Sequence, residues 1–115
     1  MSRVFVLEPT KLDVEKAKTY GTLVYVFNNG DRRASIWTEE FIEQVMTRLQ
    51  SLCYDPDGDY VAIVGHLVPM AVVIARLTYD YDHFQALCFS STEREYVVRV
   101  LGGDDTDEED GTGPV

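Results

Sequence analysis

Apolar and polar residues group along this chain in segments that predict strands and helices in turn. The apolar run at residues 60–64 has no polar interruption, as in a strand that is buried on both faces. It leads through Gly65 and His66 into a second apolar segment. Buried strands of this kind are typical of helix-covered sheets, in which ligands bind beyond the carboxyl ends of the strands. The segment therefore predicts an α/β fold and the place of a ligand site.

The other segments follow the same pattern. A helix is predicted to begin after Thr38, a good N-cap residue, and to carry apolar residues at helical spacing as far as Leu52. Two further helices are predicted at residues 11–20 and 67–79. β-Branched, aromatic and other apolar runs predict five strands, at residues 4–7, 22–27, 59–65, 84–89 and 96–101.

The resulting order, β-α-β-α-β-α-β-β, predicts a small three-layer α/β sandwich. Its sheet should be mostly parallel, with an antiparallel C-terminal hairpin strand and with the first or third strand at its centre. We expect residues 1–101 to form a single α/β domain and residues 102–115 a disordered acidic tail. The helix at 67–79 is apolar nearly all round, which predicts that it is buried.

The two cysteines, Cys53 and Cys88, fall on predicted buried faces. We expect both to be reduced core thiols, because nothing else in the sequence indicates an oxidising compartment. No segment has the charged start and long apolar centre of a secretory signal, and the apolar stretch at 67–75 is about half the length of a membrane span. We therefore expect a cytoplasmic protein that does not bind a membrane.

Charge narrows the classes of partner. The chain has 20 acidic and 10 basic residues, a formal net charge of −10, and six of the acids lie in the C-terminal segment 104–110. Nucleic acid is disfavoured as a ligand, because neutralising its phosphates requires clustered lysines and arginines. A basic surface on a protein partner fits this charge better.

Polar residues gather after the predicted parallel strands. Those after the second strand are Asn28, Asn29, Asp31, Arg32 and Arg33, and His66 follows the third strand. Arginines and a helix N-terminus could hold an anionic small molecule or a nucleotide, with hydrolysis as one outcome. The alternative is that these loops are polar only because they face water.

A second group of residues suggests a protein interface. Aromatic and acidic residues alternate at the end of the last predicted helix, and a tryptophan precedes the helix that Thr38 caps; the candidate contact residues are Trp37, Tyr79, Asp80, Tyr81 and Asp82. The alternative for the aromatic–acidic group is core packing with a solvated edge. Trp37 could instead staple the start of its helix.

The sequence contains little evidence for a nucleotide-binding motif or a metal site. No glycine-rich nucleotide motif and no histidine–cysteine spacing suited to a metal is present, so we expect no cofactor and no metal. Asp55, Asp57 and Asp59 alternate, but the segment lacks the downstream glutamate of a calcium-binding loop. It is therefore predicted to be a plain turn.

In size and layout the chain loosely resembles the small α/β accessory proteins that phages and mobile elements encode. The sequence favours a small acidic, non-enzymatic interaction module that binds a protein partner. A small-molecule-binding protein that uses the strand-end residues is the alternative. Pairing of two copies, through the last strand or the outer face of the helix at 67–79, is a third hypothesis.

Overall fold

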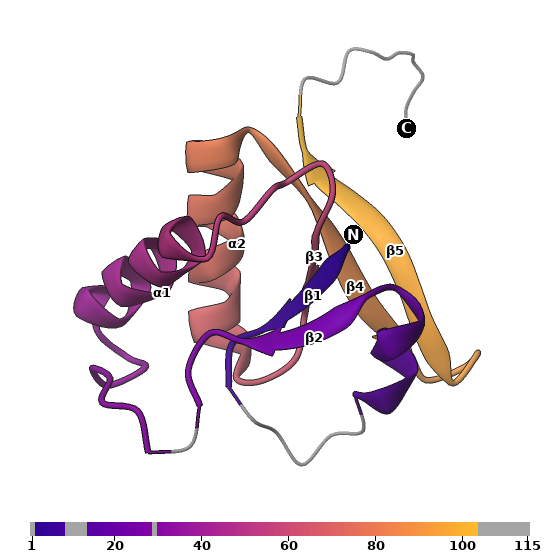
Figure 1. Ribbon diagram of the computed structural model, residues 1–115, viewed down its shortest axis with the longest axis horizontal. Coiled ribbons are helices and arrows are strands. Elements are labelled where there is room, and N and C mark those ends of the chain that lie inside the picture. Colours follow the sequence, from indigo (N-terminus) through magenta and orange to yellow (C-terminus); the bar gives the residue numbers. More distant parts are fainter. Residues whose placement is uncertain (1, 9–13, 29, 104–115) are drawn as a thin grey trace.

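A computed structural model describes residues 2–8, 14–28 and 30–103 (Figure 1). They form a five-stranded mixed sheet in the order β2-β1-β3-β4-β5. The strands are β1 (Arg3–Val6), β2 (Thr22–Tyr25), β3 (Tyr60–Ala62), β4 (His83–Ser90) and β5 (Glu95–Gly102). β1 to β4 pair in parallel, and β5 pairs antiparallel with β4. The mostly parallel sheet, its C-terminal hairpin and its central third strand are therefore confirmed.

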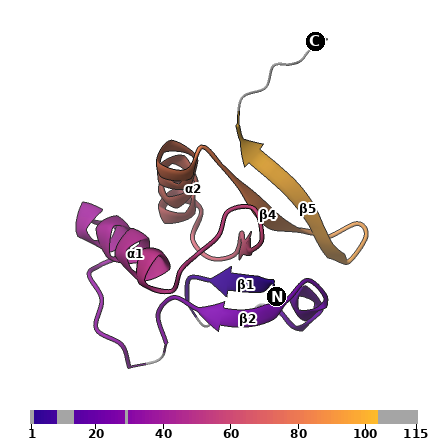
Figure 2. The same ribbon diagram turned by 45° about the horizontal axis from the view of Figure 1, so that its top comes forward.

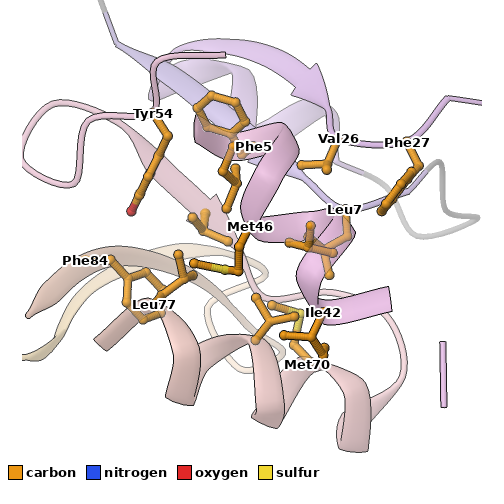
Figure 3. Packing of buried hydrophobic residues seen from close by; sticks show 14 of the residues in the cluster. Phe5, Leu7, Val26, Phe27, Ile42, Met46, Tyr54, Met70, Leu77 and Phe84 are labelled. Atoms are coloured by element: carbon orange, nitrogen blue, oxygen red, sulfur yellow. The ribbon is translucent and has the colours of Figure 1, made fainter. Parts of the chain in front are cut away.

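Two α-helices cover one face of the sheet. They are α1 (Glu39–Ser51) and α2 (Leu67–Tyr81), which lie side by side there (Figure 2). Figure 3 shows the core between them and the sheet, in which Phe5 and Phe84 of the sheet meet Met46 of α1 and Leu77 of α2. The apolar positions of α1 point into this core, as their spacing predicts.

The opposite face of the sheet carries a smaller hydrophobic core, and a short 3-10 helix packs on it. The alternate residues of the same strands, such as Val4 and Leu87, pack there with Ala17 of a 3-10 helix, η1 (Glu15–Thr19). The α-helix predicted at residues 11–20 is thus wrong for its described part, and residues 11–13 lie outside the described residues. Val14 at the N-cap offers no side-chain acceptor, and Ala17 is the buried residue of η1, so little favours a longer helix. Among the described residues, the third layer of the predicted sandwich is thus reduced to η1.

Both ends of α1 follow from local chemistry. Thr38 is its N-cap, and its hydroxyl accepts a hydrogen bond from the amide of Phe41. At the other end Cys53 adopts a positive φ of 58° and is exposed. The prediction of a buried Cys53 is therefore wrong, because the helix ends before this residue and turns it outward. Cys88 is half-buried against the core, and both thiols are free.

The C-terminal strand extends to Gly102, where the predicted tail begins. The tail residues 104–115 lie outside the described residues. Among the described helices, none combines the length and the apolar character that crossing a bilayer would require.

Candidate functional site

The strand order brings the ends of β1 and β3 together at a topological switch point. The connection after β1 leads to β2 on one side, whereas the one after β3 leads to β4 on the other. A hollow of about 160 Å³ lies there, lined by Glu8 after β1, by Gly65 and His66 after β3, and by apolar core residues such as Met70. This is the place where open α/β sheets bind ligands.

A larger and more open hollow of about 850 Å³ lies beside it, beyond β1 and β2. Its lining includes four of the predicted ligand residues, Asn28, Asp31, Arg32 and Arg33. Asn29, a further predicted residue, lies outside the described residues. His66 lines the smaller hollow instead. The fold thus collects the predicted residues at one rim, but divides them between two hollows.

Ion pairs neutralise much of the charge at this rim. Arg33 pairs with Glu8, which lines both hollows. Asp31 pairs with Arg48 of α1 at 3.1 Å, and the same guanidinium donates to the carbonyl of Val26 at 3.0 Å. One of the two arginines expected to bind an anion is therefore already engaged. Arg32 is exposed and makes no ion pair within the described residues, so it remains the cation available to a ligand.

His66 stands at the start of α2 without capping the helix through its side chain. Its ring lies 6.0 Å from the ring of Trp37. Gly65 before it adopts a φ of 115°, a conformation that favours glycine, and it sets the bend from β3 into α2. In the described ranges, no three His, Cys, Asp or Glu side chains are grouped closely enough to hold a metal ion.

The alternating aspartates form a structural turn. The amides of Gly58 and Asp59 both donate to the carbonyl of Asp55. Asp59 is 3% exposed, and its carboxylate accepts from the Arg3 amide, from the Arg3 guanidinium and from the Asp55 amide at 2.9–3.1 Å. Asp57 points outward and binds His83 at 2.6 Å. These contacts tie the turn to β1 and β4.

The solvent exposure of the outer side of α2 is the largest difference between the structure and the sequence-based predictions. The apolar residues along it are open to solvent: Leu67 is 82% exposed, Val68 59% and Val72 43%. The prediction that this helix is buried is wrong, because α1 and the sheet cover only the side that carries Met70, Val73 and Leu77. Pro69 is also buried, and Ile74 and Tyr81 pack at the edge of the same core, whereas Leu67, Val68 and Val72 stay exposed.

The predicted partner-contact residues divide between surface and core. Trp37 is 66% exposed beside the start of α2, and Tyr79 is 85% exposed near its end. Trp37 therefore does not act as a buried staple. Asp80 pairs with Arg76 at 3.4 Å, and Asp82 lies 3.4 Å from His83. Tyr81 packs edge-on against Tyr54 with ring centroids 5.2 Å apart and belongs to the core edge.

We call the exposed apolar surface of Trp37, Leu67, Val68, Val72 and Tyr79 the α2 face. The three aliphatic members were not named among the predicted partner-contact residues, although the outer face of this helix was one hypothesis for the pairing of two copies. The sequence feature that could have indicated them is that α2 is apolar nearly all round. A helix that packs against a core on one face buries only part of such a circumference. Between them lie the exposed small residues Ala71 and Ala75.

Comparison with known proteins identifies the family. A family model described as phage Pam3 gp32-like protein matches residues 2–101. The chain belongs to this family of phage Pam3 gp32-like proteins. Neither the curated proteins nor the solved structures include a significant match. The loose resemblance to small phage accessory proteins agrees with this membership, and the matched residues cover the predicted α/β domain from its second residue to its end.

Proposed function

We propose that this phage-family chain is a non-enzymatic interaction module that binds a protein partner through the α2 face. The observation that carries the proposal is the exposure of five large apolar side chains on and beside one helix. Monomeric proteins rarely expose contiguous apolar patches of this kind, and such patches often mark interaction sites. Tryptophan and tyrosine at its two ends are residue types that are enriched in interface cores and hot spots.

The charges around the α2 face favour a partner with a positive counterpart. Asp80 and Asp82 lie at the C-terminal end of the helix. Arg76 on the same helix pairs with both Glu43 and Asp80, so it adds little free positive charge. Together with the net charge of −10, this favours a positively charged group on the partner opposite the end of α2.

A matched pair of surface variants tests the proposal. The variant Val68→Ser removes an apolar side chain that is 59% exposed, and the control Val100→Ser removes the same side chain from β5, where it is 62% exposed. Immobilised full-length protein should capture its partner from phage-infected cells, and the captured protein should then rebind in purified form. Binding should fall at least about tenfold in Val68→Ser and stay unchanged in Val100→Ser. Equal binding by the two variants would refute the proposal.

A small-molecule site at the strand-end rim is the second candidate. The two hollows beyond β1, β2 and β3 favour it, because they lie at the topological switch point. A thermal-shift screen with nucleotides and simple phosphates tests it, since a ligand specific for the folded state raises the melting temperature. A rise that is lost in Arg32→Ala/Arg33→Ala would support the ligand site. If no compound shifted the melting temperature, the ligand site would be rejected and protein-partner binding would remain as the proposed function.

A further inference from the structure

The two ends of α2 differ in charge, and the fold compensates this difference only in part. The C-terminal end carries Asp80 and Asp82, although the helix dipole makes this end partially negative. The N-terminal end has partially positive amides, yet it has no acidic residue in its first turn and no side-chain cap from His66. At the C-terminal end, Arg76 and His83 each lie 3.4 Å from one of the two acids and compensate part of their charge. The N-terminal end has no acid in its first turn, so an acid is the group that it lacks.

We infer that the partner of the α2 face is a second copy of this chain, whose α2 packs antiparallel to it about a twofold axis; the inference rests on the proposed function of that face. An antiparallel arrangement places the acids of each helix beside the N-terminal amides of the other. The positive counterpart that the proposed function requires is then the start of α2 itself. A twofold interface repeats each such contact, because it uses the same patch on both copies.

The sizes of the exposed side chains suit the same arrangement. Bulky residues stand at both ends of the α2 face, with Trp37 and Leu67 at one end and Tyr79 at the other. The small, exposed Ala71 and Ala75 lie between them and permit close approach of a second helix. If the axis passes between Val72 and Ala75, residue spacing places Val68 opposite Tyr79 of the second copy. With the same axis, Ala75 lies opposite Val72 of the second copy, so a small residue faces a larger one near the centre, and Tyr79 faces Val68 toward the ends.

The exposed area is large enough for a weak but specific dimer. Aromatic side chains bury about 150–250 Å² each. With Trp37 66% exposed and Tyr79 85% exposed, the two rings offer about 300 Å² per copy, and thus about half of the roughly 1,200 Å² that the smallest stable interfaces bury. Leu67 and Val68, which are 82% and 59% exposed, supply much of the rest.

The first test is the association state of the full chain in sedimentation experiments between about 1 and 100 µM, a range suited to interfaces of this size. The wild type should dimerise. Ala75→Arg, which places two like charges at the axis, should raise the dissociation constant at least about tenfold, whereas Val100→Arg on β5 should leave it unchanged. Higher salt should strengthen the dimer, because it screens the repulsion between two chains of charge −10.

Cysteine cross-linking tests the orientation without relying on a disruptive variant. In a Cys53→Ser/Cys88→Ser background, which removes both native thiols, the single-cysteine variants Val68→Cys and Tyr79→Cys are oxidised alone and as a mixture. The antiparallel arrangement predicts that the mixture cross-links and that each variant alone cross-links much less. Efficient cross-linking of Val68→Cys with itself would overturn the arrangement.

The outcomes separate this inference from the proposed function. A chain that stays monomeric throughout, or a dimer that Ala75→Arg leaves intact, would overturn the inference. If, in either case, Val68→Ser still failed to capture the protein that the wild type captures from infected cells, the α2 face would bind a partner other than a second copy. The proposed function would then stand. A basic heterologous partner would also show the opposite salt dependence, with binding that weakens as salt rises.

Discussion

Replacement of Asp59 by alanine should destabilise the fold more than any exposed substitution in the same turn. The Asp59 side chain is 5% exposed, and its carboxylate accepts hydrogen bonds from two amides, those of Arg3 and Asp55, and from the Arg3 guanidinium. The same guanidinium donates to the carbonyls of Leu52 and Cys53 at the end of α1. Asp59 therefore fixes the cation that joins β1 to the C-terminus of α1.

The magnitude follows from what the substitution leaves behind. Removing one member of a buried, hydrogen-bonded ion pair costs about 3–5 kcal/mol, chiefly because its partners lose their acceptor. The side chain of Arg3 is 30% exposed and keeps its two carbonyl acceptors, so the lower end of that range applies. We expect a loss of about 3 kcal/mol in the free energy of unfolding, a large part of the roughly 5–15 kcal/mol typical of a domain.

Urea denaturation, followed by far-ultraviolet circular dichroism, measures this loss for Asp59→Ala beside Asp57→Ala. The Asp57 side chain is 76% exposed and binds His83 at the surface, so its removal should change the midpoint only slightly. For a domain of this size, the melting temperature of Asp59→Ala should fall by more than about 10 °C. A loss below about 1 kcal/mol, or equal losses in the two variants, would refute the reasoning.

Three further predictions concern single side chains. Thr38→Ala removes the N-cap acceptor of α1 and should cost about 1 kcal/mol in urea denaturation, whereas no loss would show that the cap is dispensable. The Tyr54 hydroxyl is buried without a protein partner among the described residues, and burial raises its pKa. Tyr54→Phe should therefore keep or increase the free energy of unfolding, and a loss above about 1 kcal/mol would refute this. Hydrogen bonds that His83 donates to Asp57 and, with a smaller effect, to Asp82 raise the pKa of His83. Its stabilising charge is therefore present below its ordinary pKa and is lost as pH rises through the higher folded value. NMR titration of His83 should give a pKa above that of an unfolded peptide, and Asp57→Asn should lower it.

Local patterns in the sequence were sufficient for most of the sheet and for both α-helices. The unbroken run at 60–64 predicted a strand with helices before and after it, and β3 lies at the centre of the sheet as such a strand should. Thr38 and the apolar spacing after it predicted α1. The segment at 11–20 failed for its described part, because a short segment with one buried residue gains too little from packing to complete an α-helix.

The sequence predicted where polar residues gather at the strand ends, but not which of them pair with one another. Parallel strands place their carboxyl ends at one edge, so a collection of polar loops there was expected. The sequence did not show that Glu8 would pair with Arg33, or that Arg48 of α1 would pair with Asp31. These pairs join residues that are 25 and 17 positions apart, and they depend on how α1 is placed against the ends of β1 and β2. They decide that Arg32 is the cation left for a ligand.

By itself, the sequence determined which residues of α2 are apolar, the net acidic charge and the succession of the strands along the chain, because periodicity, charge and turn chemistry are local properties. The tertiary structure alone decided which apolar residues of α2 stay in water. A helix that packs against one side of a sheet can bury only the residues on that side, so Met70 and Leu77 are covered while Val68 and Tyr79 are not. The candidate interface is thus the part of an apolar helix that α1, the sheet and the other described residues leave uncovered.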